Sequence, residues 1–371
     1  MGINDAVRKN MNERERFLRY MHFEPVDRIP LMEMGVWPET IERWHQEGLP
    51  KWVTSLRHLE DYLRLDRSFN INWLEINHEI YPPFEEKILE ETKEEQVISD
   101  ANGVIFRQRK SHKTIPNFIR FPIENEADYM NLLPLLDGAN PERYGDDFDE
   151  DLRWRRERGE IIGANFRGFF GFPRNYMGLE NWSMAFYDQP QLVRRIIADR
   201  LQFGKDLFKR VLSTGCLDFV QIWEDMAYKT APMISPKLVR DYMLPAYKEL
   251  VSYLRAGGVK LIMVDTDGRG NDLLPIFLEA GIDGMHPCEI AAGCDPVLLR
   301  QKHPNCTLIG GLDKRAIASG REGVDSELRR VQPVLEKGAY IPMLDHFVPP
   351  DVSYQTYLYY VEQRRVLLNR Q

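Results

Sequence analysis

The second half of the chain alternates regularly between short apolar runs and longer segments, and this pattern constrains the fold most. The apolar runs have strand length and cover residues 161–166, 219–223, 260–264, 282–286, 307–310 and 340–343. Helix-length segments separate them, at 177–213, 236–255, 271–280, 296–302, 313–337 and 350–368. Two further strands are predicted earlier, at 28–33 and 68–76. Eight strand–helix units predict an α/β fold, a (β/α)8 TIM barrel, with a doubly wound open sheet as the alternative.

One domain, residues 1–371, accommodates this pattern together with two additions. Residues 1–27 are predicted to form an amino-terminal helical extension, since the helical spacing ends before Glu24-Pro25. Residues 84–110 are predicted to form two polar strands joined at Asp100-Ala-Asn-Gly103, because Asn-Gly favours a hairpin turn. We therefore expect an antiparallel hairpin insertion outside the barrel. A helix is predicted at 38–46, and residues 116–151 are expected to be irregular or lightly helical.

Composition narrows the classes of function. Hydrophobic residues make up 43 % of the chain, which supports a substantial packed core. The chain has 49 basic and 57 acidic residues and no long basic run, so we expect no nucleic-acid or membrane partner. The four cysteines are too few for a disulfide scaffold. With no signal peptide and no apolar run of about 18 residues, a cytoplasmic location is expected. No strand is followed by Gly-x-Gly-x-x-Gly, which argues against a dinucleotide site.

In a TIM barrel the chemistry lies at the carboxyl ends of the strands. The candidate catalytic acids at these positions are Glu224, Asp225, Asp267 and Asp313, and the candidate substrate-binding residues are Glu33, Trp37, Asn165, Arg167, Trp223 and Phe347. Purely structural roles remain as alternatives for several of them. Asp313 is also suited to capping the next helix, Asp267-Gly268 to forming a turn, and the aromatic residues to packing.

The sequence His286-Pro-Cys288 at the end of the sixth strand suggests a metal site. In an extended segment, residues i and i+2 point the same way with Cα atoms about 6–7 Å apart. An imidazole and a thiolate so placed suit zinc, with His346, after the eighth strand, as the third ligand. Glu289, Cys294 and Asp345 are alternative third ligands. In the competing interpretation His286 bonds a backbone carbonyl, Cys288 packs as a small apolar group, and His346 contacts substrate directly.

Several motifs make the chain similar to the uroporphyrinogen decarboxylase superfamily over nearly its whole length. They are Glu15-Arg-Phe-Leu, Asp27-Arg-Ile-Pro, Glu224-Asp-Met-Ala, Ile234-Ser-Pro, Asp267-Gly, Gly284-Met-His-Pro-Cys-Glu, Gly310-Gly-Leu-Asp-Lys, Gly338-Ala-Tyr-Ile-Pro and Asp345-His-Phe-Val-Pro-Pro. The resemblance implies a (β/α)8 barrel with its cleft at the strand carboxyl ends.

Two branches of that superfamily imply different reactions. The true decarboxylases carry an arginine-rich loop after the first strand, whereas here the loop Met32-Glu-Met-Gly-Val-Trp-Pro-Glu-Thr has no basic residue before Arg43. This departure disfavours a polyanionic tetrapyrrole substrate. The corrinoid-linked methyltransferases, including the methylcobamide:coenzyme M enzymes, hold zinc with His-x-Cys and a later Cys. His286 and Cys288 match the first two ligands, and His346 replaces the third.

The resemblance therefore implies a zinc-assisted methyltransferase that moves a methyl group between a small methylated compound, such as a methoxylated aromatic, and a corrinoid. Because the chain has no Asp-x-His-x-x-Gly motif, the cobalamin is expected on a transient partner protein, with this chain a monomer or homodimer. The alternatives are a decarboxylase acting on a tetrapyrrole or a smaller carboxylated compound, and a barrel that only binds a tetrapyrrole.

Overall fold

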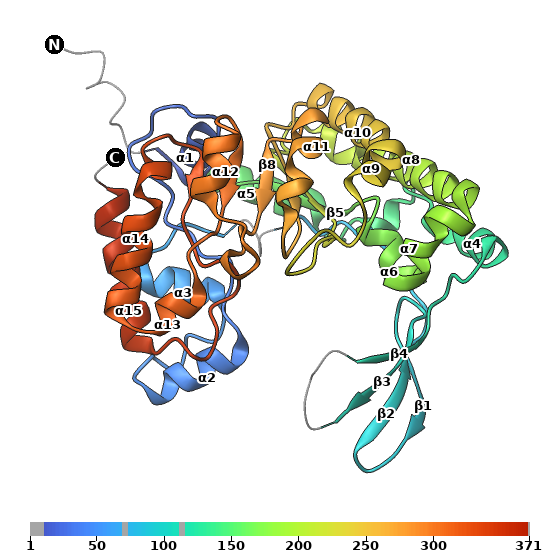
Figure 1. Ribbon diagram of the computed structural model, residues 1–371, viewed down its shortest axis with the longest axis horizontal. Coiled ribbons are helices and arrows are strands. Elements are labelled where there is room, and N and C mark those ends of the chain that lie inside the picture. Colours follow the sequence, from blue (N-terminus) through green and yellow to red (C-terminus); the bar gives the residue numbers. More distant parts are fainter. Residues whose placement is uncertain (1–10, 69–72, 111–115, 370–371) are drawn as a thin grey trace.

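A six-stranded parallel sheet forms most of the barrel wall (Figure 1). The computed structural model describes residues 11–68, 73–110 and 116–369. The strand order is β10-β9-β8-β7-β6-β5. These strands are β5 (Gly163–Arg167), β6 (Phe219–Trp223), β7 (Leu261–Asp265), β8 (Gly284–His286), β9 (Thr307–Ile309) and β10 (Tyr340–Ile341). The six strands predicted between residues 161 and 343 are thus confirmed, and their order follows the chain, as in a barrel.

Two irregular segments complete the wall. Residues 29–36 meet the last unit at the parallel bridge Val36–Val348, and Trp73 forms a parallel bridge with Gly163 of β5. The strands predicted at 28–33 and 68–76 are wrong as regular strands in the described residues, with 69–72 lying outside them. Pro30 has no N–H, and the Leu31 N–H donates to the Asp66 side chain at 2.7 Å, so few ladder bonds remain. The fold is a TIM barrel joined at this side by single bridges.

Helices cover the outside of the barrel and follow the predicted pattern closely. The helices before the sheet are α1 (Glu13–Met21), α2 (Pro38–Gln46), α3 (Leu56–Leu63), α4 (Glu126–Leu132) and α5 (Phe148–Arg158), with the 3₁₀ turns η2 (Leu133–Leu136) and η3 (Pro141–Arg143). Those between the strands are α6 (Gly171–Met177), α7 (Leu179–Asp188), α8 (Pro190–Ser213), α9 (Pro236–Leu238), the π turn η4 (Val239–Met243), α10 (Leu244–Ala256), η5 (Gly270–Asp272), α11 (Leu274–Glu279), η6 (Ile290–Ala292), α12 (Pro296–Lys302), α13 (Lys314–Ala318), α14 (Arg321–Leu335) and α15 (Tyr354–Leu368). Within the described residues, no helix has both the length and the apolar character needed to cross a bilayer.

The strands divide the core into two clusters of buried side chains. Val220 and Ile222 of β6 pack outward in the cluster that contains residues of α8 and α10. Phe219, on the opposite face of the same strand, belongs to the cluster that includes residues of α14 and α15. Alternate residues of a strand point to opposite faces, so Gln221 and Trp223 share the inner face with Phe219. This alternation places polar groups inside the barrel.

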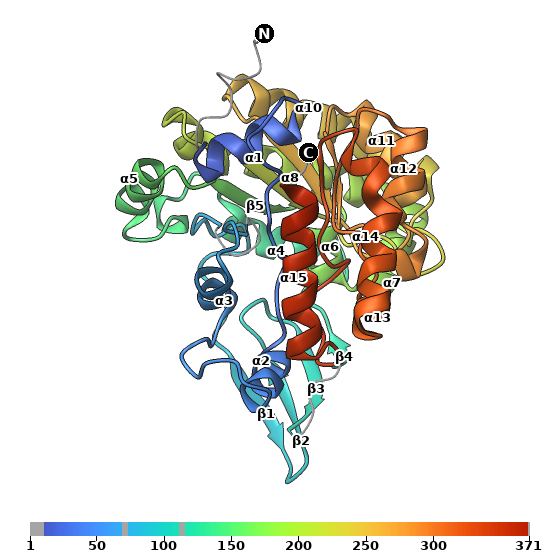
Figure 2. The same cartoon turned by 90° about the vertical axis from the view of Figure 1, so that its left-hand side faces the viewer.

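The insertion differs from the predicted hairpin. It is a four-stranded antiparallel sheet of β1 (Lys87–Glu91), β2 (Glu95–Ser99), β3 (Ile105–Arg109) and β4 (Asn117–Arg120), in that order. The turn at Asp100–Gly103 was predicted correctly, but Thr92 forms a second turn by accepting a hydrogen bond from the Glu95 N–H at 3.0 Å. Polar turn residues inside a polar strand give no contrast in the sequence. Figures 1 and 2 place this sheet at the same end of the molecule as α2 and α13.

Candidate active site at the barrel mouth

A buried chain of three polar side chains forms the floor of the mouth. Nε2 of His286, at the end of β8, lies 2.7 Å from Oε1 of Gln221, and Gln221 Nε2 donates to Asp265 Oδ2 at 2.6 Å. An amide oxygen only accepts, so Nε2 of His286 carries the proton. Burial lowers the pKa of His286 to about 3. Burial, followed by the charges of Asp267 and Asp225, raises the pKa of Asp265 well above its usual value. The floor is therefore polar with little charge.

Two carboxylates, Asp225 and Asp267, lie above this floor. Asp225 has a positive φ of 40° and pairs with Arg174. Burial, and then the charges of Asp225 and Glu289, raises the pKa of Asp267 to about 6. The adjoining Gly268 has φ +78°, and a Cβ there would lie 2.7 Å from the carbonyl oxygen of Ala227. Only glycine fits that turn, because any side chain there would collide with the backbone of Ala227.

An aromatic wall faces Asp267. The His346 ring stacks on Trp37 with centroids 6.0 Å apart and an interplanar angle of 17°, and Phe347 lies 5.1 Å from Trp37. His346 Nε2 is 3.8 Å from Asp267 Oδ2. Burial and the positive charge of Lys314 lower the pKa of His346 below its usual value. Asp267 and a largely neutral imidazole thus lie side by side against an apolar surface.

Lys314 brings a positive charge to the same region. Its Nζ lies 3.4 Å from Glu289 Oε1, and Glu289 also accepts a hydrogen bond from the Gly268 N–H at 3.0 Å. Asp345 is fully buried and accepts hydrogen bonds from the N–H groups of Ile290 and Lys314, at 3.0 and 3.1 Å. Burial raises the pKa of Asp345 to about 6. Glu289 and Asp345 are therefore engaged with the loop and with Lys314.

The predicted residues on β5 and β6 line the opposite wall. Arg167 forms an ion pair with Glu79 and lies over the Trp223 ring, 4.8 Å from its centroid. Arg174 lies 5.6 Å from the same ring. Asn165 aligns with Gln221, and among the described residues its buried Oδ1 has no hydrogen-bond partner. This wall offers an aromatic face between two guanidinium groups and one unused acceptor.

Glu224, predicted to be catalytic, is buried in a cradle of hydrogen bonds. Its carboxylate accepts from the N–H groups of Phe169, Phe170 and Gly171 at 2.8, 2.7 and 2.7 Å, and from the Tyr247 hydroxyl. Its side chain is fully buried. Of the two alternatives for Glu224-Asp225, Asp225 enters the mouth, while Glu224 anchors the loop after β5. This placement gives Glu224 a structural role.

Two other predicted residues also have structural partners. Glu33 is fully buried and pairs with Arg364 at 3.0 Å and with the Tyr360 hydroxyl at 3.1 Å, so it joins the wall to α15 instead of facing a ligand. Asp313 accepts from the Arg315 N–H at 2.9 Å as the N-cap of α13, and it also binds the Arg315 guanidinium. Asp313 therefore has the capping role that the sequence analysis gave as the alternative.

The predicted zinc ligands do not converge. His286 is bonded to Gln221 in the floor, the Cys288 thiol lies against that of Cys294, and His346 stacks on Trp37. β8 ends at His286, so Cys288 does not continue the extended segment that the i, i+2 argument requires. In the described part of the chain, no three His, Cys, Asp or Glu side chains are placed to hold a metal ion. These donors do not fit a zinc ion.

Four residues of the mouth were missed by the sequence analysis: Gln221, Arg174, Glu79 and Lys314. The period-2 alternation of β6 marks Gln221 as an inward polar residue, and Lys314 is the last residue of the quoted Gly310-Gly-Leu-Asp-Lys motif, to which the sequence analysis assigned no role. Glu79 and Arg174 carry no local signal. They reach the mouth only through tertiary packing.

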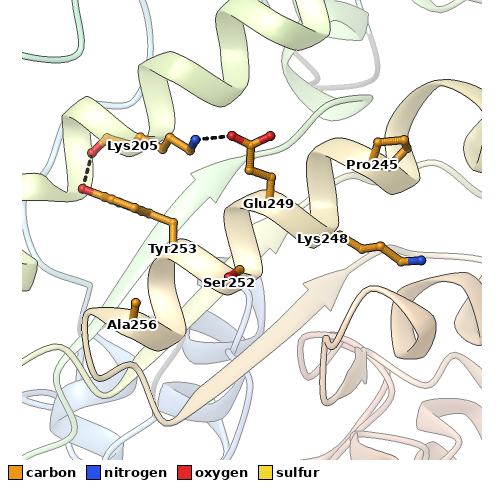
Figure 3. Close-up of a pocket in the computed structure, with 7 residues that line it drawn as sticks. All are labelled: Lys205, Pro245, Lys248, Glu249, Ser252, Tyr253 and Ala256. Atoms are coloured by element: carbon orange, nitrogen blue, oxygen red, sulfur yellow. Dashed lines mark hydrogen bonds and ion pairs between the residues drawn. The ribbon is translucent and has the colours of Figure 1, made fainter.

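Besides a hollow of about 610 Å³ lined by residues 73–77, 81 and 142–146, two others formed by described residues lie outside the floor. One, of about 390 Å³, lies where the inserted sheet meets α6 and includes Arg174. The other is a groove on the outer surfaces of α8 and α10, lined by Lys205, Pro245, Lys248, Glu249, Ser252, Tyr253 and Ala256 (Figure 3). Lys205 there pairs with Glu249, and Lys248 with Glu279 at 2.9 Å. The groove's cations are satisfied by neighbouring carboxylates, and none of its residues follows a strand end.

Comparison with known structures agrees with this architecture. A methyltransferase from Methanosarcina mazei superposes with a TM-score of 0.63 at 14 % identity, covering 97 % of this chain and 99 % of that one. A B12-independent methionine synthase from a Shewanella species, in complex with selenomethionine, gives a TM-score of 0.39 at 15 % identity, covering 62 % and 70 %. None of the curated proteins searched matches the chain. The first similarity shows a shared fold.

A family model identifies the chain more specifically. The model of uroporphyrinogen decarboxylase (URO-D) matches residues 173–366, which is more than half of the sequence. The matched region runs from α6 to α15 and contains Asp225, Asp267 and His346. The chain belongs to the URO-D family.

Proposed function

We propose that this chain is a methyltransferase that moves a methyl group from a small methylated compound to a corrinoid carried by a separate partner protein. Members of the URO-D family are enzymes, and the Methanosarcina protein with the same fold is described as a methyltransferase. The observation that carries the proposal is the pair of Asp267 and His346 against the aromatic wall of Trp37 and Phe347.

The chemistry of demethylation explains why this pair suits the reaction. Breaking the bond between a methyl carbon and an oxygen leaves negative charge on the oxygen, so a proton delivered there lowers the barrier. A carboxylic acid with a pKa of about 6 retains part of its protonated form near neutral pH and transfers that proton readily. His346, kept largely neutral by burial and Lys314, orients the donor oxygen. The partner's corrinoid supplies the nucleophile that accepts the methyl group.

The charges of the mouth favour this substrate over a tetrapyrrole with many carboxylates. Each of the three cations described above has a carboxylate partner: Arg167 pairs with Glu79, Arg174 with Asp225, and Lys314 with Glu289. A polyanion would have to displace these carboxylates, which costs Coulomb energy in a partly buried site. A small neutral substrate fits without this cost.

Methyl transfer to free cob(I)alamin tests the proposal. The purified chain is mixed with chemically reduced cobalamin and a panel of O-, N- and S-methyl compounds, and methylcobalamin is followed by absorbance. We expect turnover with at least one donor and a loss of about 100-fold in kcat for Asp267→Asn. Asp272→Asn, an exposed carboxylate on the same loop, serves as the matched control and should retain full activity.

A pH profile separates proton donation from a structural role. The wild-type rate is expected to fall as pH rises above about 6, and this decrease should vanish in Asp267→Asn. Absence of methyl transfer from every donor, together with decarboxylation of uroporphyrinogen, would replace the proposal with the decarboxylase alternative.

A further inference from the structure

The side chains of Asp267 and His346 lie close together without touching. Their nearest atoms, Asp267 Oδ2 and His346 Nε2, are 3.8 Å apart, which is longer than a hydrogen bond, and both side chains are partly exposed. One oxygen atom above the two could lie about 3 Å from each without moving either side chain. A carboxylate and an imidazolium would instead approach to about 2.7–2.9 Å and close this gap. The gap therefore stays open only while the two groups are not an ion pair.

Glu289, after β8, fixes the backbone beside the acid. Its Oε2 accepts a hydrogen bond from the Gly268 N–H at 3.0 Å, and its Oε1 lies 3.4 Å from Lys314 Nζ. Each oxygen of this carboxylate thus has a partner. Because Gly268 directly follows Asp267, the hydrogen bond limits how far the acid can move.

Lys314, the first residue of α13, is connected to both sides of the gap. Its side chain lies against Glu289, and its N–H donates to Asp345 Oδ1 at 3.1 Å. Asp345 is fully buried and directly precedes His346. Through these two acids, Lys314 connects the loop that carries Asp267 with the loop that carries the imidazole.

The positive charge of Lys314 acts against an imidazolium at His346. The charged or titratable side chains that face the two groups come from the ends of β6, β7 and β8 and from α6 and α13: Asp225, Asp265, Glu289, Arg174 and Lys314. Burial lowers the pKa of His346, and Lys314 lowers it further. Glu289 and Asp225 act in the opposite direction, each more weakly than Lys314. The imidazole is therefore kept largely neutral although carboxylates surround it.

The negative charge of Glu289 acts against a carboxylate at Asp267. Burial raises the pKa of Asp267 to about 6, and the charges of Asp225 and Glu289 add to this effect. Lys314 and Arg174 act in the opposite direction, but Arg174 is also engaged with Asp225. An ion pair across the gap needs both charges at once, so Glu289 opposes one of its charges and Lys314 opposes the other.

From these observations we infer that Glu289 and Lys314 are positioning residues that hold the acid and the neutral imidazole apart, with room for one substrate oxygen between them. This inference rests on the proposed function and adds how its site is kept open to the substrate. Neither residue has to touch the substrate for this role.

Titration by nuclear magnetic resonance tests the inference without substrate. Histidine and aspartate side chains are labelled with ¹³C, and the two signals are assigned by their absence in His346→Gln and Asp267→Asn. We expect the apparent pKa of His346 to rise by about one unit in Lys314→Met, and that of Asp267 to fall by about one unit in Glu289→Gln. Glu289→Gln retains an oxygen that can accept the Gly268 N–H, so it removes the charge and keeps the hydrogen bond.

Two controls separate the effect of charge from a structural effect. Lys314→Arg keeps the charge and should titrate like wild type. Lys302→Met, at an exposed lysine in the last turn of α12, should do the same. Shifts in the same direction in Lys314→Met and Glu289→Gln would indicate loosened loops and overturn the inference, as would the absence of a shift in either variant.

The methyl-transfer assay separates this inference from the proposed function. Lys314→Met should raise KM for the methyl donor about 10-fold and change kcat by less than about 3-fold, because the closed gap excludes the donor oxygen, and Lys314→Arg should restore KM. The expected titration shifts without methyl transfer from any donor would leave the inference standing and remove the proposed function. Methyl transfer without those shifts would do the reverse.

Discussion

The carboxylate of Glu224 holds the loop after β5 in place, so its replacement should destabilise the fold. Glu224→Ala would leave three backbone N–H groups and the Tyr247 hydroxyl without their acceptor in a fully buried site. Each buried donor without a partner costs about 1–3 kcal/mol. Relaxation and water entry recover part of that sum, so we expect a loss of about 4 kcal/mol in the free energy of unfolding.

Two milder variants give a graded series. In Glu224→Gln, the amide nitrogen can face the Tyr247 hydroxyl, which turns to accept, but it then opposes the Phe169 N–H at the same position. One donor is thus lost, at about 2 kcal/mol. Tyr247→Phe removes a donor while three remain for the carboxylate, and it should cost about 1 kcal/mol.

Urea unfolding followed by circular dichroism measures the series, with the exposed Glu249→Ala as a control expected within about 0.5 kcal/mol of wild type. If the slope of the free energy of unfolding against urea concentration is the same in all variants, a shift in the unfolding midpoint reports a change in stability. A Glu224→Ala protein within about 1 kcal/mol of wild type would refute the structural role and return Glu224 to the candidate catalytic acids.

Three further predictions concern the charges and thiols. Burial raises the pKa of Asp267 from 3.8 to about 6, so this acid favours the folded state below pH 3.8 and that contribution is lost as the pH rises through 6. Relative to wild type, Asp267→Asn should therefore gain about 1 kcal/mol in the free energy of unfolding between pH 4 and pH 8, a value reduced because the side chain is half-exposed. Urea titrations measure this difference, and a difference that does not change with pH would contradict the prediction. Elemental analysis should find the same zinc content in Cys288→Ser as in wild type when both are produced in zinc-replete medium. Loss of zinc in the variant alone would show that Cys288 is a zinc ligand. Glu33→Gln removes the charge that faces the buried Arg364 and should lower the free energy of unfolding by about 3 kcal/mol. The exposed control Glu362→Gln should lower it by about 0.5 kcal/mol. Equal effects of the two variants in urea unfolding would contradict a buried ion pair.

In the irregular parts of the barrel wall, the local sequence pattern was insufficient to predict the secondary structure. Residues 29–36 have the apolar character of a strand, but Asp66 takes the Leu31 N–H that a ladder would use. The inserted sheet likewise contains a turn at Thr92 that its Asn-Gly signal does not predict, because Thr92 turns the chain within a polar stretch. Side-chain acceptors compete with backbone acceptors, and residue spacing carries no information on which one wins.

The sequence by itself determined the order of strands and helices, because period-2 and 3.6-residue patterns reflect contacts within one element and its nearest neighbours. It also indicated that carboxylates, imidazoles and aromatic residues collect at the strand ends. Which of them face the mouth depended on the tertiary structure. Glu224 turns into a cradle of N–H groups from another loop, while Asp267 and His346 meet from units three strands apart, after β7 and after β10. Their roles follow from burial and from partners distant in the chain, and these are properties of the packed barrel.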